Sequence, residues 1–294
     1  MANLSSFRDL GIILVAGLSA ACAADEALTS TVSGVPDAGT TRHAVLHATA
    51  SSSRTTGVAT PIQIQGQLIA WSGVEHQALF DALGLWTPRT DHEACRILEE
   101  PRVDSPGLEV RFEDMGPLWL SAHGETLLSS ARELPSMGSR IAGVIYTAGG
   151  PVFDEHAVPV RLYLGFPGLA DSPVWPVSVP APVRIAQVAG ADPGTASRVP
   201  VSGSEEVSVD LASEAEVLEV LIRPASGVPW PIMECRVLSA ESMILDPSEM
   251  ERWFGDVDLD LVVTSRQVIR SSMRDATPVD VIVEWRDQIV LERQ

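Results

Sequence analysis

The sequence predicts a mainly β protein with two β-sandwich lobes and one or two short helices. From residue 61 onward, apolar residues recur chiefly at every second position, which is the spacing of half-buried strands. These apolar runs are short, rich in β-branched residues and bounded by Gly or Pro, as is usual in sandwiches and barrels. A single segment near residue 250 carries clear signals for the start and the end of a helix.

The first 21 residues predict a signal peptide. Gly11–Ala21 is an uninterrupted run of apolar and small residues that follows Arg8. The run fits the apolar region of a signal peptide and is shorter than the roughly 20 residues of a membrane-spanning helix. Ala20 and Ala21 are the small residues that a signal peptidase needs before its cut, and Cys22 follows directly.

Leu18-Ser19-Ala20-Ala21-Cys22 resembles the lipobox of bacterial lipoproteins. The resemblance implies that the Cys22 thiol receives a diacylglyceryl group, that the chain is cut before Cys22, and that the new amino terminus is acylated. Ser19 stands where the family more often has Leu, Val or Ile, which leaves a plain secretory cut open. Ala23, in place of Asp, implies sorting to the outer membrane.

Residues 22–60 are predicted to be a lipidated cysteine followed by a flexible tether. Ala23–Thr60 contains no aromatic residue other than histidine and is dominated by Ala, Ser, Thr and Gly. Such a composition buries too little apolar surface to offset the entropy of ordering. His43 and His47 have the spacing of a metal clamp on a helix, but no third ligand is near and no helix is expected, so we interpret the spacing as chance.

Residues 61–166 predict a first β-sandwich domain. Gln63, Gln65 and Gln67 alternate with apolar neighbours at the start of this segment. Further strands are expected at Leu108–Phe112, Leu118–Ser121, Ile141–Thr147 and Val158–Leu164. Glu75–Leu83 is a weaker helix candidate.

Residues 167–182 contain five prolines. Because proline cannot donate a hydrogen bond to a sheet, this segment predicts either an interdomain connector or a set of edge strands.

Residues 183–294 predict a second Ig-like sandwich. Strands are expected at Val183–Val188, Val207–Leu211, Val217–Ile222, Ile232–Leu238, Val257–Val263 and Val279–Leu291. A helix is expected after Asp246, with Pro247 at its first position, Glu249 in a capping box and Gly255 at its end. Met250, Trp253 and Phe254 would form its buried face.

Two short repeats bear on this architecture. Cys95-Arg96-Ile97-Leu98 and Cys235-Arg236-Val237-Leu238 share a Cys-Arg-aliphatic-Leu pattern, which is compatible with a duplicated lobe. Together with Asp114–Leu118 and Tyr146–Phe153, the second repeat also resembles uncharacterised two-lobed β-sandwich lipoproteins of bacteria, from about Glu109 onward. This resemblance implies a two-lobed β-sandwich architecture, and it implies no particular activity.

The net charge of −19 argues against binding to nucleic acid, whose phosphates need a basic surface. With Cys22 acylated, Cys95 and Cys235 remain as an even pair in an oxidising compartment. They predict either one disulfide or two buried small side chains. The alternative of a reactive thiol near His92 is weaker.

Asp256, Asp258 and Asp260 would share one face of a strand. A hard cation such as Ca²⁺ would relieve the repulsion among their carboxylates, whereas a solvated outer face would explain the pattern without a metal. Trp175 and Trp230 lie among prolines, so they are the candidates for an exposed platform that stacks on sugar rings.

No nucleophile elbow, zinc-protease motif or phosphate-binding loop occurs in the chain. The sequence therefore favours a non-enzymatic lipoprotein of the cell envelope, without a cofactor, that serves as an interaction or structural module. Its partners would be the membrane, through the lipid, and an envelope protein or glycan. The alternatives are a carbohydrate- or Ca²⁺-binding module and a hydrolase without a recognisable motif.

Overall fold

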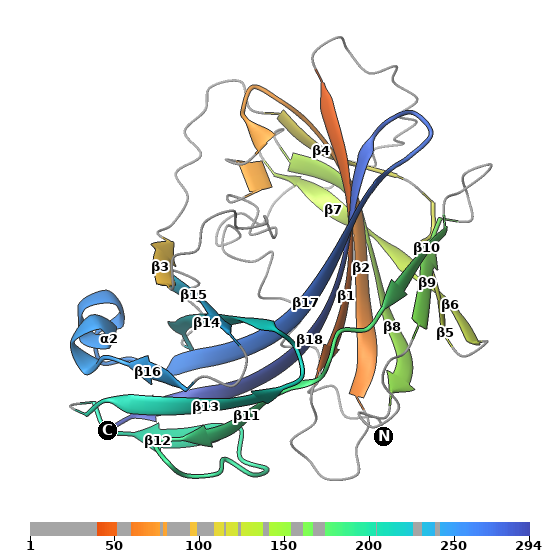
Figure 1. The fold of residues 1–294 in the computed structure, drawn as a ribbon. Helices are drawn as coiled ribbons and strands as arrows, with labels where there is room; N and C mark the ends of the chain where they lie inside the picture. The colour runs from red at the N-terminus through yellow and green to blue at the C-terminus, as the bar shows by residue number, and fades with distance from the viewer. Residues whose placement is uncertain are drawn as a thin grey trace, which may run out of the picture.

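A long antiparallel hairpin of β17 (Leu259–Ser272) and β18 (Pro278–Arg293) forms the middle of the fold (Figure 1). It is seen in a computed structural model that describes residues 40–51, 60–76, 79–80, 95–98, 109–114, 116–122, 125–137, 141–153, 161–166, 174–203, 205–225, 231–238 and 242–294. Both strands are buried on both faces over much of their length. Their buried stretches combine apolar residues with buried polar ones, among them Asp260, Thr264, Glu284 and Asp287.

The hairpin belongs to a main sheet in which the described residues form eleven strands. The strand order is β3-β15-β14-β17-β18-β1-β2-β4-β8-β7, and β12 pairs with β18 beside this path. The bounds of the other strands are β1 Thr41–Ser51, β2 Thr60–Ser72, β3 Cys95–Leu98, β4 Glu109–Glu113, β7 Ser130–Met137, β8 Ile141–Phe153, β12 Arg198–Val201, β14 Val217–Pro224 and β15 Ile232–Leu238.

Two smaller sheets lie against one face of the main sheet. One has the order β10-β9-β5-β6, with β10 Val174–Ser178, β9 Arg161–Gly165, β5 Trp119–Ala122 and β6 Glu125–Leu128. The other has the order β11-β13-β16, with β11 Val183–Val188, β13 Val207–Ser213 and β16 Met243–Leu245. In Figure 1, β11 and β13 cross one end of the main sheet, and β10 and β9 lie toward its other end. A single apolar core joins all three sheets.

Two close contacts fix the small sheets on the main one. Gly66 of β2 lies against Leu118 and Leu46, and a Cβ at this position would come within 3.0 Å of a Leu118 methyl group. At the other small sheet, the buried carboxylate of Asp287 accepts a hydrogen bond from the backbone N–H of Ile185 at 2.7 Å. The missing side chain of Gly66 therefore leaves room for Leu118 and Leu46, and Asp287 bonds directly to the backbone of β11.

The one complete helix in the described part of the chain is α2 (Pro247–Phe254), and the prediction for it is confirmed. Asp246 caps it by accepting a hydrogen bond from the N–H of Ser248, and Gly255 ends it at a φ of 63°. Met250 and Phe254 are buried, whereas Trp253 is partly buried. No helix among the described residues has the length and apolarity to cross a membrane.

The predicted tether over residues 22–60 is wrong for its later part. Thr41–Ser51 forms β1, which lies between β18 and β2 in the main sheet. Ala44, Leu46, Ala48 and Ala50 alternate along the segment and lie in the main core. One of the two strands that flank the segment is β18, far away in the sequence, which composition alone does not reveal. The signal peptide over residues 1–21 and Cys22 lie outside the described residues.

The main sheet also contains strands from both predicted domains. Strands β2, β4, β7 and β8 come from residues 61–166, whereas β14, β15, β17 and β18 come from residues 183–294. Within the proline-rich segment, Val174–Ser178 is β10, an edge strand. Of the two interpretations of residues 167–182, the edge strand is the one found for this part. The mainly β prediction is confirmed, although the main sheet does not divide at the predicted boundary.

Candidate functional site

A row of charged and polar side chains, buried or partly buried, crosses the face of the main sheet that points away from the two small sheets. Along β18, Val281, Val283 and Trp285 point into the shared core, so the alternation of a strand places Glu284 on the opposite face. Paired residues on neighbouring strands share a face, and the register therefore brings charges from five further strands toward this side. We name this set the polar row: Arg96, Glu234, Glu219, Arg266, Glu284, Arg286, Thr49 and His47.

Glu284 is the centre of the polar row and is 0% exposed. Its Oε1 accepts a hydrogen bond from Nη2 of Arg286 at 2.6 Å and lies 3.1 Å from Nε2 of His47. Its Oε2 accepts hydrogen bonds from Nε and Nη2 of Arg266, each at 3.3 Å. The hydroxyl of Thr49 also donates to Oε1 at 3.3 Å. Together, the two carboxylate oxygens are therefore contacted from three adjacent strands, β17, β18 and β1.

Burial disfavours the charged form of Glu284, but the positive charges of His47, Arg286 and Arg266 outweigh burial. The pKa of Glu284 consequently lies well below its ordinary value of 4.5. The carboxyl group is therefore ionised at neutral pH, so it is a fixed negative charge and not a proton donor.

Arg266 joins Glu284 to a second carboxylate. Its Nη1 forms an ion pair with Glu219 on β14. The pKa of Glu219 is raised, chiefly because burial disfavours its charged form, and the nearby carboxylates of Glu234 and Glu284 add to the rise while Arg266 opposes it. Two carboxylates therefore share one guanidinium, and their pKa values move in opposite directions.

The row continues to the edge of the sheet. On β15, Glu234 is 6% exposed and accepts a hydrogen bond from Nε of Arg96 on β3 at 2.6 Å. The same face carries Asp260 of β17, which pairs with Arg223 at 3.4 Å. Each of these carboxylates contacts an arginine. The row can thus fix strand register and order, because a slip by one residue would bring these charges into the apolar core.

A second group, of histidines and aromatic rings, lies beside the polar row. Nδ1 of His43 is 3.3 Å from Nε2 of His76, and Nε2 of His43 is 3.1 Å from Oδ2 of Asp280. His76 and Phe80 have ring centroids 4.1 Å apart, and Trp71 lies beside both rings. Burial, followed by the charge of His43, lowers the pKa of His76. His76 is therefore neutral at neutral pH and able to accept a proton.

Sequence reasoning missed the polar row, although it noted His43 and His47. The two histidines are four residues apart on a strand, so they share a face and contact different carboxylates, Asp280 and Glu284. The available signal was a charge inside an apolar run, as in Val281-Ile282-Val283-Glu284-Trp285. Such a charge predicts a buried partner, because an unpaired buried charge is strongly unfavourable.

The three candidate Ca²⁺ ligands are not gathered by the structure. Asp256 is exposed and precedes β17, Asp258 is 3.6 Å from Arg198, and Asp260 is buried against Arg223. The strand begins only at Leu259, so the alternation expected for all three residues applies to Asp260 alone. Within the described ranges, no three His, Cys, Asp or Glu side chains are placed to hold a metal ion.

The candidate sugar platform is also placed differently from the prediction. Trp175 lies on β10 and is 5% exposed, packed edge-on against Phe166 at a centroid distance of 6.1 Å. It is therefore a core residue, and its exposure was predicted wrongly because the flanking prolines indicated a loop. Trp230 lies outside the described residues.

Cys95 and Cys235 form a disulfide between β3 and β15. The two Cys-Arg repeats are therefore antiparallel neighbours at one edge of the main sheet, where Cys235 lies opposite Cys95. This arrangement resolves the two alternatives for the pair in favour of the disulfide.

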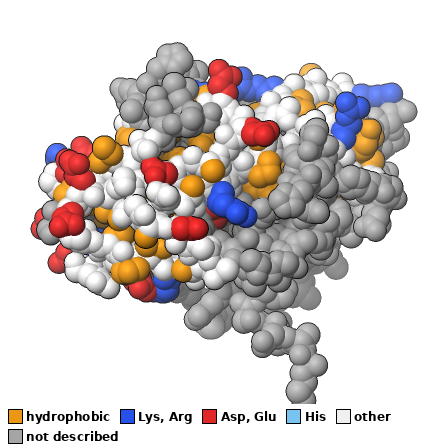
Figure 2. Space-filling view, turned by 60° about the horizontal axis from the view of Figure 1, so that its bottom comes forward, with side chains coloured by type: hydrophobic (Ala, Val, Ile, Leu, Met, Phe, Trp, Pro, Cys, Tyr) orange, Lys and Arg blue, Asp and Glu red, His pale blue; other side chains and the backbone are white. Residues whose placement is uncertain are grey.

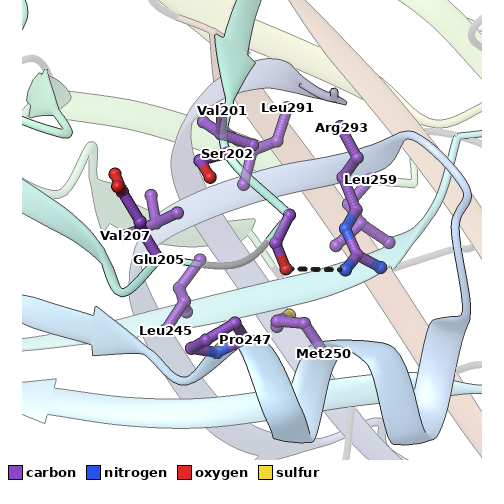
Figure 3. A pocket seen from close by; sticks show the side chains of 11 residues that line it. Val201, Ser202, Glu205, Val207, Leu245, Pro247, Met250, Leu259, Leu291 and Arg293 are labelled. Atoms are coloured by element: carbon purple, nitrogen blue, oxygen red, sulfur yellow. Dashed lines mark hydrogen bonds between the residues drawn. The ribbon is translucent and has the colours of Figure 1, made fainter.

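A small cavity lies where α2 meets the ends of the sheets (Figure 3). Its volume of about 20 Å³ holds about one water molecule. Apolar side chains such as Leu245, Met250 and Leu291 line it, and the guanidinium of Arg293 contacts the carbonyl oxygen of Gly203 at 3.5 Å. The space is too small for an organic ligand.

No family model, no curated protein and no solved structure matches the chain.

Proposed function

We propose that the chain is the precursor of an exported bacterial lipoprotein, anchored through Cys22, whose β-sheet body is a non-enzymatic interaction or structural module of the cell envelope. The observation that carries the proposal is the disulfide between Cys95 and Cys235. Structural disulfides persist in oxidising compartments outside the cytoplasm. This agrees with a leader that ends in Ala20-Ala21-Cys22 and with sorting to the outer membrane.

The charge distribution on the surface and the contacts in the polar row support the proposal that the body is non-enzymatic. On the face shown in Figure 2, acidic side chains are spread among uncharged ones, and a net charge of −19 favours solubility of a body held at a membrane. The carboxylates of Glu234, Asp260 and Glu284 each contact an arginine. These carboxylates thus form ion pairs within the sheet, and they are not positioned to contact a substrate.

The two predicted sandwich lobes are also compatible with the three sheets. They would correspond to the main sheet paired with the β10-β9-β5-β6 sheet at one end and with the β11-β13-β16 sheet at the other. Both lobes would then share one continuous layer, which gives a rigid body suited to contacts with an envelope protein.

The anchor is tested by expressing the full chain in a bacterial host and measuring the mass of its amino terminus. We expect an acylated Cys22 as the first residue and partition of the protein into the detergent phase. The matched control is Cys22→Ser, which should keep an uncleaved or differently cleaved leader and stay in the aqueous phase. A native protein that retains Met1 with an unmodified Cys22 thiol would overturn the proposal.

The absence of catalysis is tested separately on the purified body. We expect no turnover of ester, peptide or glycan substrates, and cross-linking in intact cells should give discrete adducts only while Cys22 is present. Hydrolysis that is lost on His76→Ala would instead support an enzyme, because His76 is the neutral and exposed imidazole next to Asp280 and His43.

Glycan binding is a second candidate, favoured by one observation on the four-stranded sheet. Tyr163 and Val174 are 40% and 45% exposed, and Pro176 lies opposite Tyr163 on the same outward face. An exposed ring on the surface of a sheet can stack on a sugar. Calorimetric titration with envelope oligosaccharides should then show binding that Tyr163→Ala abolishes and Ile244→Ala, at an exposed apolar position on β16, leaves intact. Equal results for the two variants would remove this candidate.

A further inference from the structure

The strand β3 is attached to the main sheet in an unusual way for an edge. It has four residues, and β15 is its one neighbour in the described strand order. The register pairs Ile232 with Leu98 at one end and Cys235 with Cys95 at the other, where the disulfide links the two strands. A short pairing of this kind offers few backbone hydrogen bonds to offset the entropy of ordering β3.

The two sulfur atoms have different surroundings. Cys235 is 1% exposed and belongs to the apolar core, whereas Cys95 is an exposed residue. Thiol–disulfide exchange requires a thiolate to reach one of the two sulfur atoms. Attack on Cys235 is blocked by the core, so the accessible position is Sγ of Cys95.

One further interaction crosses from β3 to β15. Nε of Arg96 donates a hydrogen bond to the buried carboxylate of Glu234 at 2.6 Å, and Ile97 is partly buried against the core. These contacts orient β3 on the sheet edge. They involve two residues of a four-residue strand, so the covalent link is the main constraint that keeps β3 in place.

We propose that β3 is a redox-controlled strap that covers the backbone edge of β15 and is released by a dithiol reductant. One thiolate of the dithiol attacks Sγ of Cys95, the bond between the two protein sulfurs breaks, and Sγ of Cys235 leaves and takes up a proton. The second thiol of the dithiol then attacks the mixed disulfide. This step releases the Cys95 thiol and oxidises the reductant to its own disulfide. The strap depends on β3 and β15 and is independent of the proposed lipid anchor.

The register predicts which amides release of the strap would expose. The Cα atoms of Cys95 and Cys235 are 4.0 Å apart, which marks a pair without mutual backbone hydrogen bonds in an antiparallel ladder. The amides of Met233 and Cys235 therefore point toward β14, and those of Ile232 and Glu234 point toward β3. Loss of β3 should expose the second pair and leave the first pair bonded.

The test is hydrogen–deuterium exchange at residue resolution on the full chain, in a Cys22→Ser background so that the two disulfide cysteines are the only thiols. On reduction with dithiothreitol, exchange at Ile232 and Glu234 should accelerate at least about tenfold, whereas exchange at Met233 and Cys235 should stay unchanged. Cys95→Ser should show the accelerated rates without reductant and should not respond to dithiothreitol.

Arg96→Ala, with the disulfide intact, is the matched control and should keep Ile232 and Glu234 protected. Unchanged exchange at these two amides after reduction would overturn the proposal. So would acceleration of all four amides together with those of β17, because the disulfide would then stabilise the whole sheet and not a strap.

Discussion

At the residue scale, Glu284 shows how a charge can occupy the interior of a sheet. Its two oxygens contact Arg266, Arg286 and His47, which belong to three adjacent strands. A buried ion pair adds little net stability, because desolvation cancels much of the attraction, but removing one partner leaves an uncompensated buried charge. The residue is therefore expected to be intolerant of change.

We predict that Glu284→Gln lowers the free energy of unfolding by about 3–5 kcal/mol, because the buried guanidinium of Arg266 loses a counter-charge. Urea unfolding followed by tryptophan fluorescence measures the change. The matched control is Glu292→Gln, which removes the more exposed pair with Arg198 and should leave the unfolding midpoint near that of the wild type. Similar midpoints for the two variants would contradict the role of Glu284.

The stability should also depend on pH through Glu284. The unfolded chain protonates this carboxyl near its ordinary pKa of 4.5, and the folded chain does so at lower pH. Between these values the unfolded state binds the extra proton, so the stability present above pH 4.5 is lost as the pH falls. We expect a shallower acid-induced loss in Glu284→Gln than in the wild type, measured by urea midpoints from pH 7 to pH 3. Parallel curves would contradict the pKa shift.

Glu219 contributes with the opposite sign, because its pKa is raised in the folded state. Above its ordinary pKa the folded state holds the proton more tightly than the unfolded state does, so falling pH stabilises the fold through this residue. The two carboxylates that share Arg266 thus partly cancel in acid, and the two single variants should change the pH profile in opposite directions.

At the element scale, local signals predicted best. The helix α2 was predicted with its cap at Asp246 and its end at Gly255, because capping is decided by residues within one turn of each other. The strands Val183–Val188 and Ile232–Leu238 were predicted with their observed bounds. The local strand character of each segment was sufficient for these predictions.

The sequence did not predict which strands are neighbours in the sheet. Strand β1 lies parallel to β18, with Thr49 opposite Glu284, and nothing near Thr41–Ser51 indicates this neighbour. The two-residue alternation of side chains along a strand predicts which face of the sheet carries His47, but it does not predict the residue on the neighbouring strand that contacts it. The polar row therefore could not be assembled from sequence. Strands were predicted near β14, β15 and β18, but the strand predicted at Val257–Val263 ended before Arg266 of β17.

Packing of the four-stranded sheet on β2 gives a second stability prediction. We expect Gly66→Ala to destabilise the protein by about 1–3 kcal/mol, because the added methyl group would press on Leu118 and Leu46 in a filled core. Thermal and urea unfolding measure the effect. Gly203→Ala is the matched control, since its nearest neighbour would be 3.4 Å away, and should be tolerated. Equal tolerance at both positions would show that the sheets can move apart.

At the scale of the whole molecule, one sheet connects both halves of the chain. The sequence predicted the class correctly, but it placed a boundary at residues 167–182, where proline density is highest. Proline has no backbone N–H to donate to a neighbouring strand, so it is tolerated in a linker and also in an edge strand such as β10. Composition cannot distinguish these two, because both leave backbone N–H groups unpaired.

The parallel contact of β1 with β18 has a consequence for biogenesis. Thr49 and Glu284 are 235 positions apart, so β1 is synthesised long before its neighbour exists. Contacts this distant form slowly, and until β18 has been synthesised the early strands would present unpaired edges that favour aggregation. A nascent chain stalled before residue 278 should therefore depend on a holdase chaperone, and the centre of the sheet would be among the last parts of the fold to form.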